Sequence, residues 1–289
     1  MLNVTTVRFD VALNYFVMRL LSPFGLFRAK GTSSSGGEEV SGLRENGIVE
    51  IRGVEKDKRD SLITFFCERV AGKDGKKFNT LPDYFDYYRR EKIQRPTGLF
   101  ATGRGDCAIT NFVMNDYLID IASRYLGLDR KNIVAQANID ALIRVEGARV
   151  KLTNYDDALE FHRDIDSYKF LKMFVYLTDC FQGDGHHEVY LGSHRYTPLS
   201  LGPIARYTNA EVERAIPQAR IHFVEGRAGY AFAEDTFAFH RGTKPRTGDR
   251  LILNIEFMES TFASLYERTF PVWSAGRGDW SRPPLTSDL

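Results

Sequence analysis

The stretch Arg250-Leu-Ile-Leu-Asn-Ile-Glu-Phe257 alternates between two kinds of side chain along its whole length. Successive side chains of a β-strand point to opposite faces, so Arg250, Asn254 and Glu256 would share one face with Ile252. The other face would be entirely apolar. This pattern predicts a strand with one face in the hydrophobic core and the other, which carries Arg250, turned toward a polar cavity.

Similar short runs follow one another through the second half of the chain. About eight strand-like runs at close spacing, without intervening helices, indicate a jelly roll or barrel rather than a parallel sheet. The runs used for this prediction cover residues 133–137, 141–145, 161–164, 170–177, 222–224, 229–232 and 251–257.

The first half of the chain has helical spacing instead. Apolar residues recur at helical intervals in 58–70 and again in 111–126, where Gly127 is expected to end the helix. Between the N-terminus and these helices, the Asn-Gly pair within 43–51 predicts a turn that leads into a strand. We therefore expect a mainly β fold with flanking helices (α+β), in which the N-terminal helices cover one face of the sheet.

The domain organisation follows from composition. Residues 1–40 form an N-terminal segment that ends in a Gly/Ser-rich linker, and residues 41–289 form the main domain. A stretch rich in Pro and Gly at 195–221 interrupts the strand series, contains a short helix at 209–215, and is expected to be an insert or lid. The apolar run at 13–27 is interrupted by Arg19 and Pro23 and is too short to span a bilayer. A helix on the domain surface is favoured, and peripheral membrane contact stays open.

Charge and cysteine content exclude several classes of function. The net charge is +1, so no global field attracts nucleic acid. The three cysteines, Cys67, Cys107 and Cys180, are scattered without a CxxC pair, which is typical of reduced thiols. A small-molecule substrate, no nucleic-acid partner and a cytoplasmic location are therefore expected, whereas the oligomeric state cannot be deduced.

A candidate metal site comes from His162 and Asp164. Two residues apart on an extended segment, their side chains leave the same face. His240, in the stretch 235–240, would share a strand face with Thr236 and Ala238 and point into a cavity. Two imidazoles and one carboxylate are the set that holds non-haem Fe(II) and leaves coordination sites open.

Arg250 would point into the same cavity, where a buried guanidinium requires an anion. A dicarboxylate co-substrate would satisfy it through paired hydrogen bonds. The aromatic and basic segment 78–100 is a candidate pocket lining for a ringed or anionic substrate; aromatics that simply fill the core are the alternative.

Four motifs in this order resemble the phytanoyl-CoA dioxygenase-like family. They are His162-Arg163-Asp164, then Lys172 to Asp179, then Gly192-Ser-His-Arg195, then His240 followed ten residues later by Arg250. The family consists of Fe(II)- and 2-oxoglutarate-dependent oxygenases on a double-stranded β-helix, and the resemblance covers about residues 40 to 260. One departure is Gly185-His-His-Glu188, where many relatives have a Gly-Pro turn.

The resemblance implies that His162, Asp164 and His240 bind iron and that Arg250 binds the distal carboxylate of 2-oxoglutarate. O2 would be the second co-substrate, with succinate and CO2 as products and ascorbate as a reductant in vitro. An aspartate at position 164, rather than glycine or alanine, favours hydroxylation over halogenation.

Further co-substrate contacts are expected on neighbouring strands, at Thr236 and Lys172. The substrate is expected to be small and polar or anionic, such as a sugar or a carboxylated or phosphorylated metabolite.

Two alternatives of another class remain. One is a catalytically silent barrel that binds a ligand, and the other is a cupin-like metal-dependent isomerase or hydrolase, against which Arg250 argues. His186-His-Glu188 is a competing metal cluster, but adjacent strand residues diverge. His194 is expected to make structural hydrogen bonds.

Overall fold

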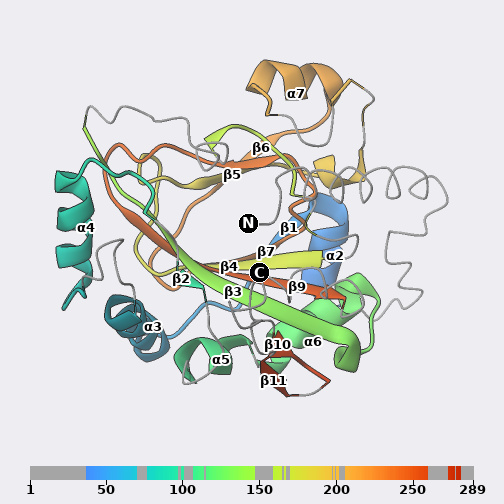
Figure 1. Ribbon diagram of the computed structural model, residues 1–289. Coiled ribbons are helices and arrows are strands. Elements are labelled where there is room, and N and C mark those ends of the chain that lie inside the picture. The colour runs from blue at the N-terminus through green and yellow to red at the C-terminus, as the bar shows by residue number, and fades with distance from the viewer. Residues whose placement is uncertain are drawn as a thin grey trace, which may run out of the picture.

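The computed structural model describes most of residues 41–289, and Figure 1 shows how its helices and strands are arranged. The predicted N-terminal segment and its linker lie almost entirely outside the described residues, as does part of the expected insert. The structure describes residues 37–69, 77–96, 99–100, 107–113, 115–146, 159–164, 166, 170–196, 198, 200–201, 206–259, 273–276 and 278–280.

Two antiparallel sheets form the centre of the molecule. The larger sheet has the strand order β1-β7-β4-β9-β3-β10-β11, with β2 paired to β3, and the smaller sheet has the order β6-β5-β8. The larger sheet consists of β1 (Ile48–Ile51), β2 (Leu99–Phe100), β3 (Ile133–Leu142), β4 (Phe170–Tyr176), β7 (Ala231–Glu234), β9 (Arg250–Glu259), β10 (Trp273–Ser274) and β11 (Asp279–Trp280). The smaller sheet consists of β5 (His187–Tyr190), β6 (Ile221–Val224) and β8 (His240–Gly242).

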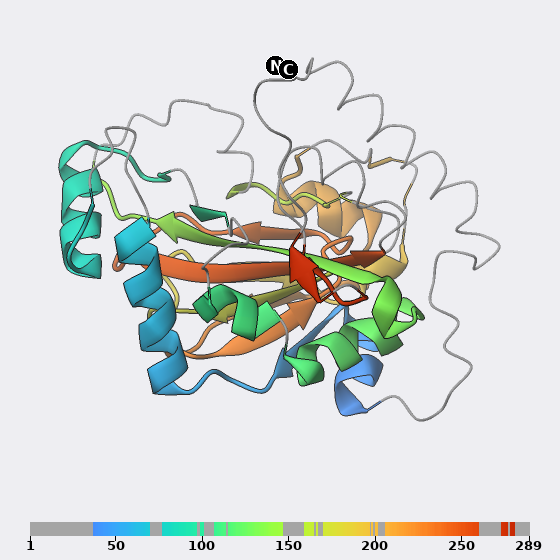
Figure 2. The same cartoon turned by 60° about the horizontal axis from the view of Figure 1, so that its bottom comes forward.

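Helices from the first half of the chain cover the outer face of the larger sheet. In Figures 1 and 2, α3, α5 and α6 lie on this face, whereas β5 and β6 lie on the opposite side of the sheet and α7 lies beyond them. The helices are α2 (Glu38–Asn46), α3 (Lys56–Arg69), α4 (Leu81–Arg90), α5 (Cys107–Val113), α6 (Asp116–Leu126) and α7 (Asn209–Ala215), with short 3-10 turns η2 (Arg130–Asn132) and η4 (Ser193–Arg195).

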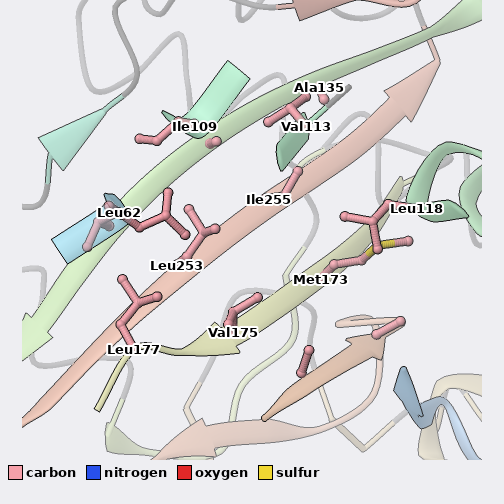
Figure 3. Packing of buried hydrophobic residues seen from close by; sticks show 14 of the residues in the cluster. Leu62, Ile109, Val113, Leu118, Ala135, Met173, Val175, Leu177, Leu253 and Ile255 are labelled. Carbon is pink, nitrogen blue, oxygen red and sulfur yellow. The ribbon is translucent and has the colours of Figure 1, made fainter. Parts of the chain in front are cut away.

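The main hydrophobic core lies between these helices and the larger sheet. Figure 3 shows Leu253 and Ile255 of β9 beside Met173 and Val175 of β4, all buried under side chains from the helices. The aromatic residues of α4, which were a candidate pocket lining, belong to this core; Tyr84 is 1% exposed. Their packing agrees with the alternative in which they fill the core on the face away from the smaller sheet.

The inner face of the larger sheet is divided into two halves. Over β4 and β7 it is aromatic, and Phe174, Tyr176 and Phe232 pack with Val189 and Val224 of the smaller sheet. Over β3 and β9 it is polar and partly open. Its residues there are Gln136, Asn138, Asp140, Asn254 and Glu256, and we call this set the β3/β9 polar wall.

The expected fold class is confirmed: a two-sheet, cupin-like β core is backed by N-terminal helices. The helices at 58–70 and 209–215 are also confirmed as α3 and α7. Of the described helices, none is both long and apolar enough to cross a membrane. The side chains of Cys67 and Cys180 are buried free thiols.

Two local predictions were wrong. The helix expected at 111–126 is broken at Asn115, whose side chain accepts a hydrogen bond from the Tyr117 amide and starts α6. The two runs expected at 133–145 form one strand, β3. The Asn-Gly turn that leads into a strand within 43–51 is confirmed: Gly47, at φ 80°, ends α2, and β1 begins at Ile48.

Candidate metal centre

His162, Asp164 and His240 come together between the two sheets. One ligand atom from each lies within 4.8 Å of the others. Asp164 Oδ1 is 3.6 Å from His162 Nε2, and Asp164 Oδ2 is 3.5 Å from His240 Nε2. Two atoms bound to one first-row metal ion at about 2.1 Å can lie up to about 4.2 Å apart, so these separations fit a common ion.

The backbone holds these residues in register. His162 and His240 form an antiparallel bridge in which each amide donates to the other's carbonyl at 3.0 Å. The Asp164 amide donates to the Thr236 carbonyl at 2.9 Å. The side chains therefore start from backbone positions that main-chain hydrogen bonds already fix.

The same segments orient both imidazole rings. Nδ1 of His162 is 2.9 Å from the Glu160 carbonyl, and Nδ1 of His240 is 3.0 Å from the Ala238 carbonyl. A carbonyl can only accept, so Nδ1 carries the proton in each ring and the Nε2 lone pair faces Asp164. This is the tautomer that a metal ligand requires.

The surroundings shift the pKa values of the two rings in opposite directions. Burial, together with His240, lowers the pKa of His162 to about 3, so this ring is neutral at physiological pH. Burial also disfavours the charged form of His240, but the neighbouring Asp164 carboxylate outweighs it and raises the pKa. A divalent cation bound at the site would favour the neutral form of both rings.

Lys172 of β4 is the nearest cationic partner of Asp164. Its Nζ lies 2.8 Å from Asp164 Oδ2 and 2.6 Å from Asp166 Oδ2, and the side chain is largely buried. Burial opposes ionisation of Asp164, yet Lys172 and then His240 hold the pKa of this carboxyl well below its usual value. Lys172 thus keeps the Asp164 carboxylate, a candidate metal ligand, ionised and fixes its orientation.

Thr236 lies on the other side of Asp164, in a turn rather than a strand. The expected strand over residues 235–240 was wrong, because residues 235–239 form a turn and β8 begins at His240. Asp235 closes that turn by accepting hydrogen bonds from the Phe237 amide through its side chain and from the Ala238 amide through its carbonyl. Thr236 is buried, and its hydroxyl has no hydrogen-bond partner among the described residues.

Arg250 is the first residue of β9 and is 9% exposed. Its guanidinium donates to the Gly185 carbonyl, while its Nε atom has no partner. Within the described ranges no carboxylate forms an ion pair with it. A buried guanidinium without an ion pair is costly unless an anion neutralises its charge. This environment therefore still favours an anionic ligand beside Arg250.

His187 is a site residue that sequence reasoning did not identify. Its ring stacks on the His240 ring at 5.4 Å between centroids, and its Nε2 lies 2.7 Å from Oε2 of the fully buried Glu234. The only signal was the doublet His186-His187, in which one member had to face inward. Strand alternation showed that the two would diverge but could not show which one faces the site.

His186 points away from this centre, as the alternation requires. Its Nε2 is 3.2 Å from Glu188 Oε1, and Arg241 Nε donates to the other oxygen of Glu188 at 2.8 Å. This arrangement is an ion-pair cluster rather than a metal-ligand set. His194 is also structural: its Nε2 lies 3.3 Å from the Arg44 carbonyl and its ring contacts the position of Gly47.

Comparison with known proteins supports the fold. No protein-family model and no curated protein sequence matches the chain. Among solved structures, EctD from S. alaskensis in its apo form has a TM-score of 0.56 at 13% identity, covering 78% of this chain and 79% of EctD. EctD with 2-oxoglutarate and 5-hydroxyectoine gives 0.54 at 11% identity, covering 79% of each chain. EctD with bound Fe gives 0.53 at 12%, covering 78% of this chain and 79% of EctD.

At this level of identity the likeness defines the class of fold alone. The chain therefore has the cupin-like two-sheet architecture that EctD also has. Membership of the phytanoyl-CoA dioxygenase-like family stays a prediction.

Proposed function

We propose that this protein is a non-haem Fe(II)- and 2-oxoglutarate-dependent dioxygenase that hydroxylates a C–H bond of a small polar substrate. The observation that carries the proposal is the convergence of two imidazole nitrogens and one carboxylate within 4.8 Å. Three protein ligands leave coordination positions open for co-substrates, which a fully closed structural site would not. The EctD structures, which contain bound Fe in one case and 2-oxoglutarate in another, are consistent with it.

In this proposal His162, Asp164 and His240 hold the iron. Bound Fe(II) would supply O2 activation coupled to oxidation of 2-oxoglutarate, which gives succinate, CO2 and the hydroxylated product. The protein's own contribution is geometric. The Glu160 and Ala238 carbonyls orient the rings, and Lys172 holds the carboxylate in direction.

Arg250 is the proposed partner of the distal carboxylate of 2-oxoglutarate, since its guanidinium forms no ion pair with a carboxylate of the described residues and its Nε has no hydrogen-bond partner there. Thr236 and Lys172 are retained as further proposed contacts on either side of Asp164; the buried hydroxyl of Thr236 lacks a partner among the described residues. His187 lies against His240 and can exclude water from the same space. O2 completes the co-substrates, and ascorbate would keep the iron reduced in vitro.

The test is anaerobic titration of the full chain with Fe(II) and 2-oxoglutarate, followed by O2 uptake and succinate formation. We expect a visible charge-transfer band when both are present and slow uncoupled succinate formation in air. Asp164→Ala should abolish the band, and Arg250→Leu should weaken 2-oxoglutarate binding at least about tenfold.

His222→Ala is the matched control, because His222 is an exposed histidine on β6 and should leave the band unchanged. Binding of Fe(II) without 2-oxoglutarate would favour the isomerase or hydrolase alternative. Binding of both without any succinate would favour the silent ligand-binding barrel.

A further inference from the structure

The β3/β9 polar wall contains a pair of side chains that the proposed chemistry does not use. Gln136 and Glu256 face each other across the β3–β9 ladder, and Gln136 Nε2 donates to Glu256 Oε2 at 2.8 Å. After this bond is made, Gln136 Oε1 and Glu256 Oε1 remain buried without a partner among the described residues. Both orphaned atoms accept hydrogen bonds in the amide and carboxylate forms.

This pair lies next to the candidate metal centre. Glu256 is directly opposite Lys172 in the β4–β9 ladder, and Lys172 Nζ bonds Asp164. Directly opposed residues on neighbouring strands have Cβ atoms about 5 Å apart. Gln136, Glu256, Lys172 and Asp164 therefore form one continuous row that crosses the inner face to the metal ligand.

The pair lies at the other end of β9 from Arg250. Glu256 lies six positions after Arg250 along the strand, which is roughly 20 Å at the rise of an antiparallel strand. A short diacid that extends from the metal toward Arg250 leaves this end of the row unoccupied. The substrate must approach the metal from a side that the co-substrate does not fill.

The β3/β9 polar wall contains acidic residues but no basic ones. None of its five residues is basic, and two of them, Asp140 and Glu256, are acidic. Glu256 is 3% exposed, and burial, with Asp166 beside it, raises the pKa of its carboxyl to about 8. In the free protein this carboxyl is therefore largely protonated at neutral pH, whereas Gln136 Oε1 is an acceptor at any pH. A buried polar atom without a partner is costly; a hydroxyl can bond to either form of Glu256, and an ammonium group would favour its carboxylate form.

We propose that Gln136 and Glu256 form the substrate-recognition subsite and that they bind a hydroxyl or ammonium group of the substrate. This inference rests on the proposed function, because it takes the metal centre as the reacting end of the pocket. It selects among the substrates considered from the sequence: polyols and amines fit this subsite, whereas a phosphate or carboxylate placed here would face the free oxygens of Gln136 and Glu256, because the nearby Lys172 is already paired with Asp164 and Asp166.

The test uses the full chain loaded with Mn(II) and 2-oxoglutarate, with Zn(II) as the diamagnetic reference. Proton relaxation of three probes on one scaffold is measured: glucose, glucosamine and glucose 6-phosphate. Mn(II) relaxes only a probe that binds close to it, and the electron paramagnetic resonance of Mn(II) reports metal loading independently. We expect relaxation of glucose or glucosamine and at least about tenfold less for glucose 6-phosphate.

Glu256→Leu and Gln136→Leu should each reduce the relaxation about tenfold or more while Mn(II) loading persists. Glu256→Gln keeps a hydrogen-bonding side chain that cannot ionise, so glucosamine, which would favour the carboxylate, should lose most of its binding, whereas glucose should lose little. Glu68→Leu, at an exposed glutamate of α3, is the matched control and should change nothing.

Loss of Mn(II) loading in the unmodified protein would refute the proposed function itself. With loading intact, the subsite is refuted if neither donor probe is relaxed, if glucose 6-phosphate is relaxed as strongly, or if Glu256→Leu leaves the effect unchanged.

Discussion

At the scale of single residues, the candidate centre depends on charges that are buried together. Lys172 compensates two carboxylates, Asp164 and Asp166, at hydrogen-bond distance. A metal ion bound to Asp164 would take over part of that compensation. The lysine and the ion therefore stabilise the same carboxylate by the same electrostatic means.

Replacement of this lysine tests the relation. We expect Lys172→Met to lower the free energy of unfolding of the metal-free protein by about 2–4 kcal/mol, because it leaves two partly buried carboxylates uncompensated. Mn(II) should restore more stability to the variant than it adds to the unmodified protein. Urea denaturation with and without Mn(II) measures both effects.

Lys56→Met is the control, because Lys56 pairs with Asp60 on the surface of α3 at 76% side-chain exposure and should cost less than about 1 kcal/mol. Equal Mn(II) stabilisation of the Lys172 variant and the unmodified protein would contradict the shared role.

Glu256 predicts a pH dependence of stability. Its folded-state pKa of about 8 lies above the usual 4.5, chiefly because the carboxyl is buried. Between these values the folded state binds the extra proton, so stability falls as the pH rises from 4.5 to 8, at up to about 1.4 kcal/mol per pH unit. Glu256→Gln should remove this component, and thermal unfolding from pH 5 to pH 8 measures the difference. Parallel curves for the two proteins would show that Glu256 is ionised at neutral pH in the folded state.

The site residues differ in how far the sequence could reveal them. His162 and Asp164 were predicted together because two residues on one extended segment share a face, and Arg250 because its strand pattern put it on the polar side. His240 was predicted from a strand pattern over 235–240 that the structure does not show, although the residue does lie beside the other two. His187 was missed because strand alternation shows that the side chains of His186 and His187 point to opposite faces but not which of them points toward the site. The pairing of Gln136 with Glu256 depends on the β3–β9 register, which no local pattern specifies.

At the scale of elements, the strands were predicted better than the turns between them. The hydrophobic runs that define β4 and β9 extend over seven and ten residues: β4 is buried along its whole length, and β9 turns one face toward the helices. The breaks depend on single hydrogen bonds. The side chains of Asn115 and Asp235 each accept a hydrogen bond from the backbone amide two residues later in the chain. The spacing of hydrophobic residues gives no sign of such a bond.

The break before α6 can be tested directly. Asn115→Ala should lower the free energy of unfolding by about 1 kcal/mol, because the Tyr117 amide loses its capping acceptor. Asn115→Asp keeps a capping oxygen and should stay within about 0.5 kcal/mol of the unmodified protein. Chemical denaturation distinguishes the two, and an equal loss in both variants would mean that the cap is not the reason α6 starts there.

At the scale of the whole molecule, the two faces of the larger sheet have separate tasks. The outer face and the helices form the main hydrophobic core, whereas the inner face carries the candidate centre and the polar wall. Stability and ligand binding should therefore respond to different substitutions.

Leu253→Ala removes a fully buried side chain from the outer-face core and should cost about 2–5 kcal/mol. Mn(II) affinity, measured where the variant is still folded, should remain within about threefold, because the triad is on the other face. Phe223→Ala, at a half-exposed residue of β6, is the control and should have little effect on stability. A large loss of affinity in the Leu253 variant would show that the faces are energetically coupled.

The bridge between His162 and His240 joins segments that are far apart in the sequence. An ion held by both imidazoles would act as a reversible cross-link that closes the long loop between them. Such a closure restricts the unfolded chain by an amount on the order of 4 kcal/mol for a loop of this size, comparable with a disulfide. Supply of that ion would then shift the equilibrium between the folded and the unfolded chain.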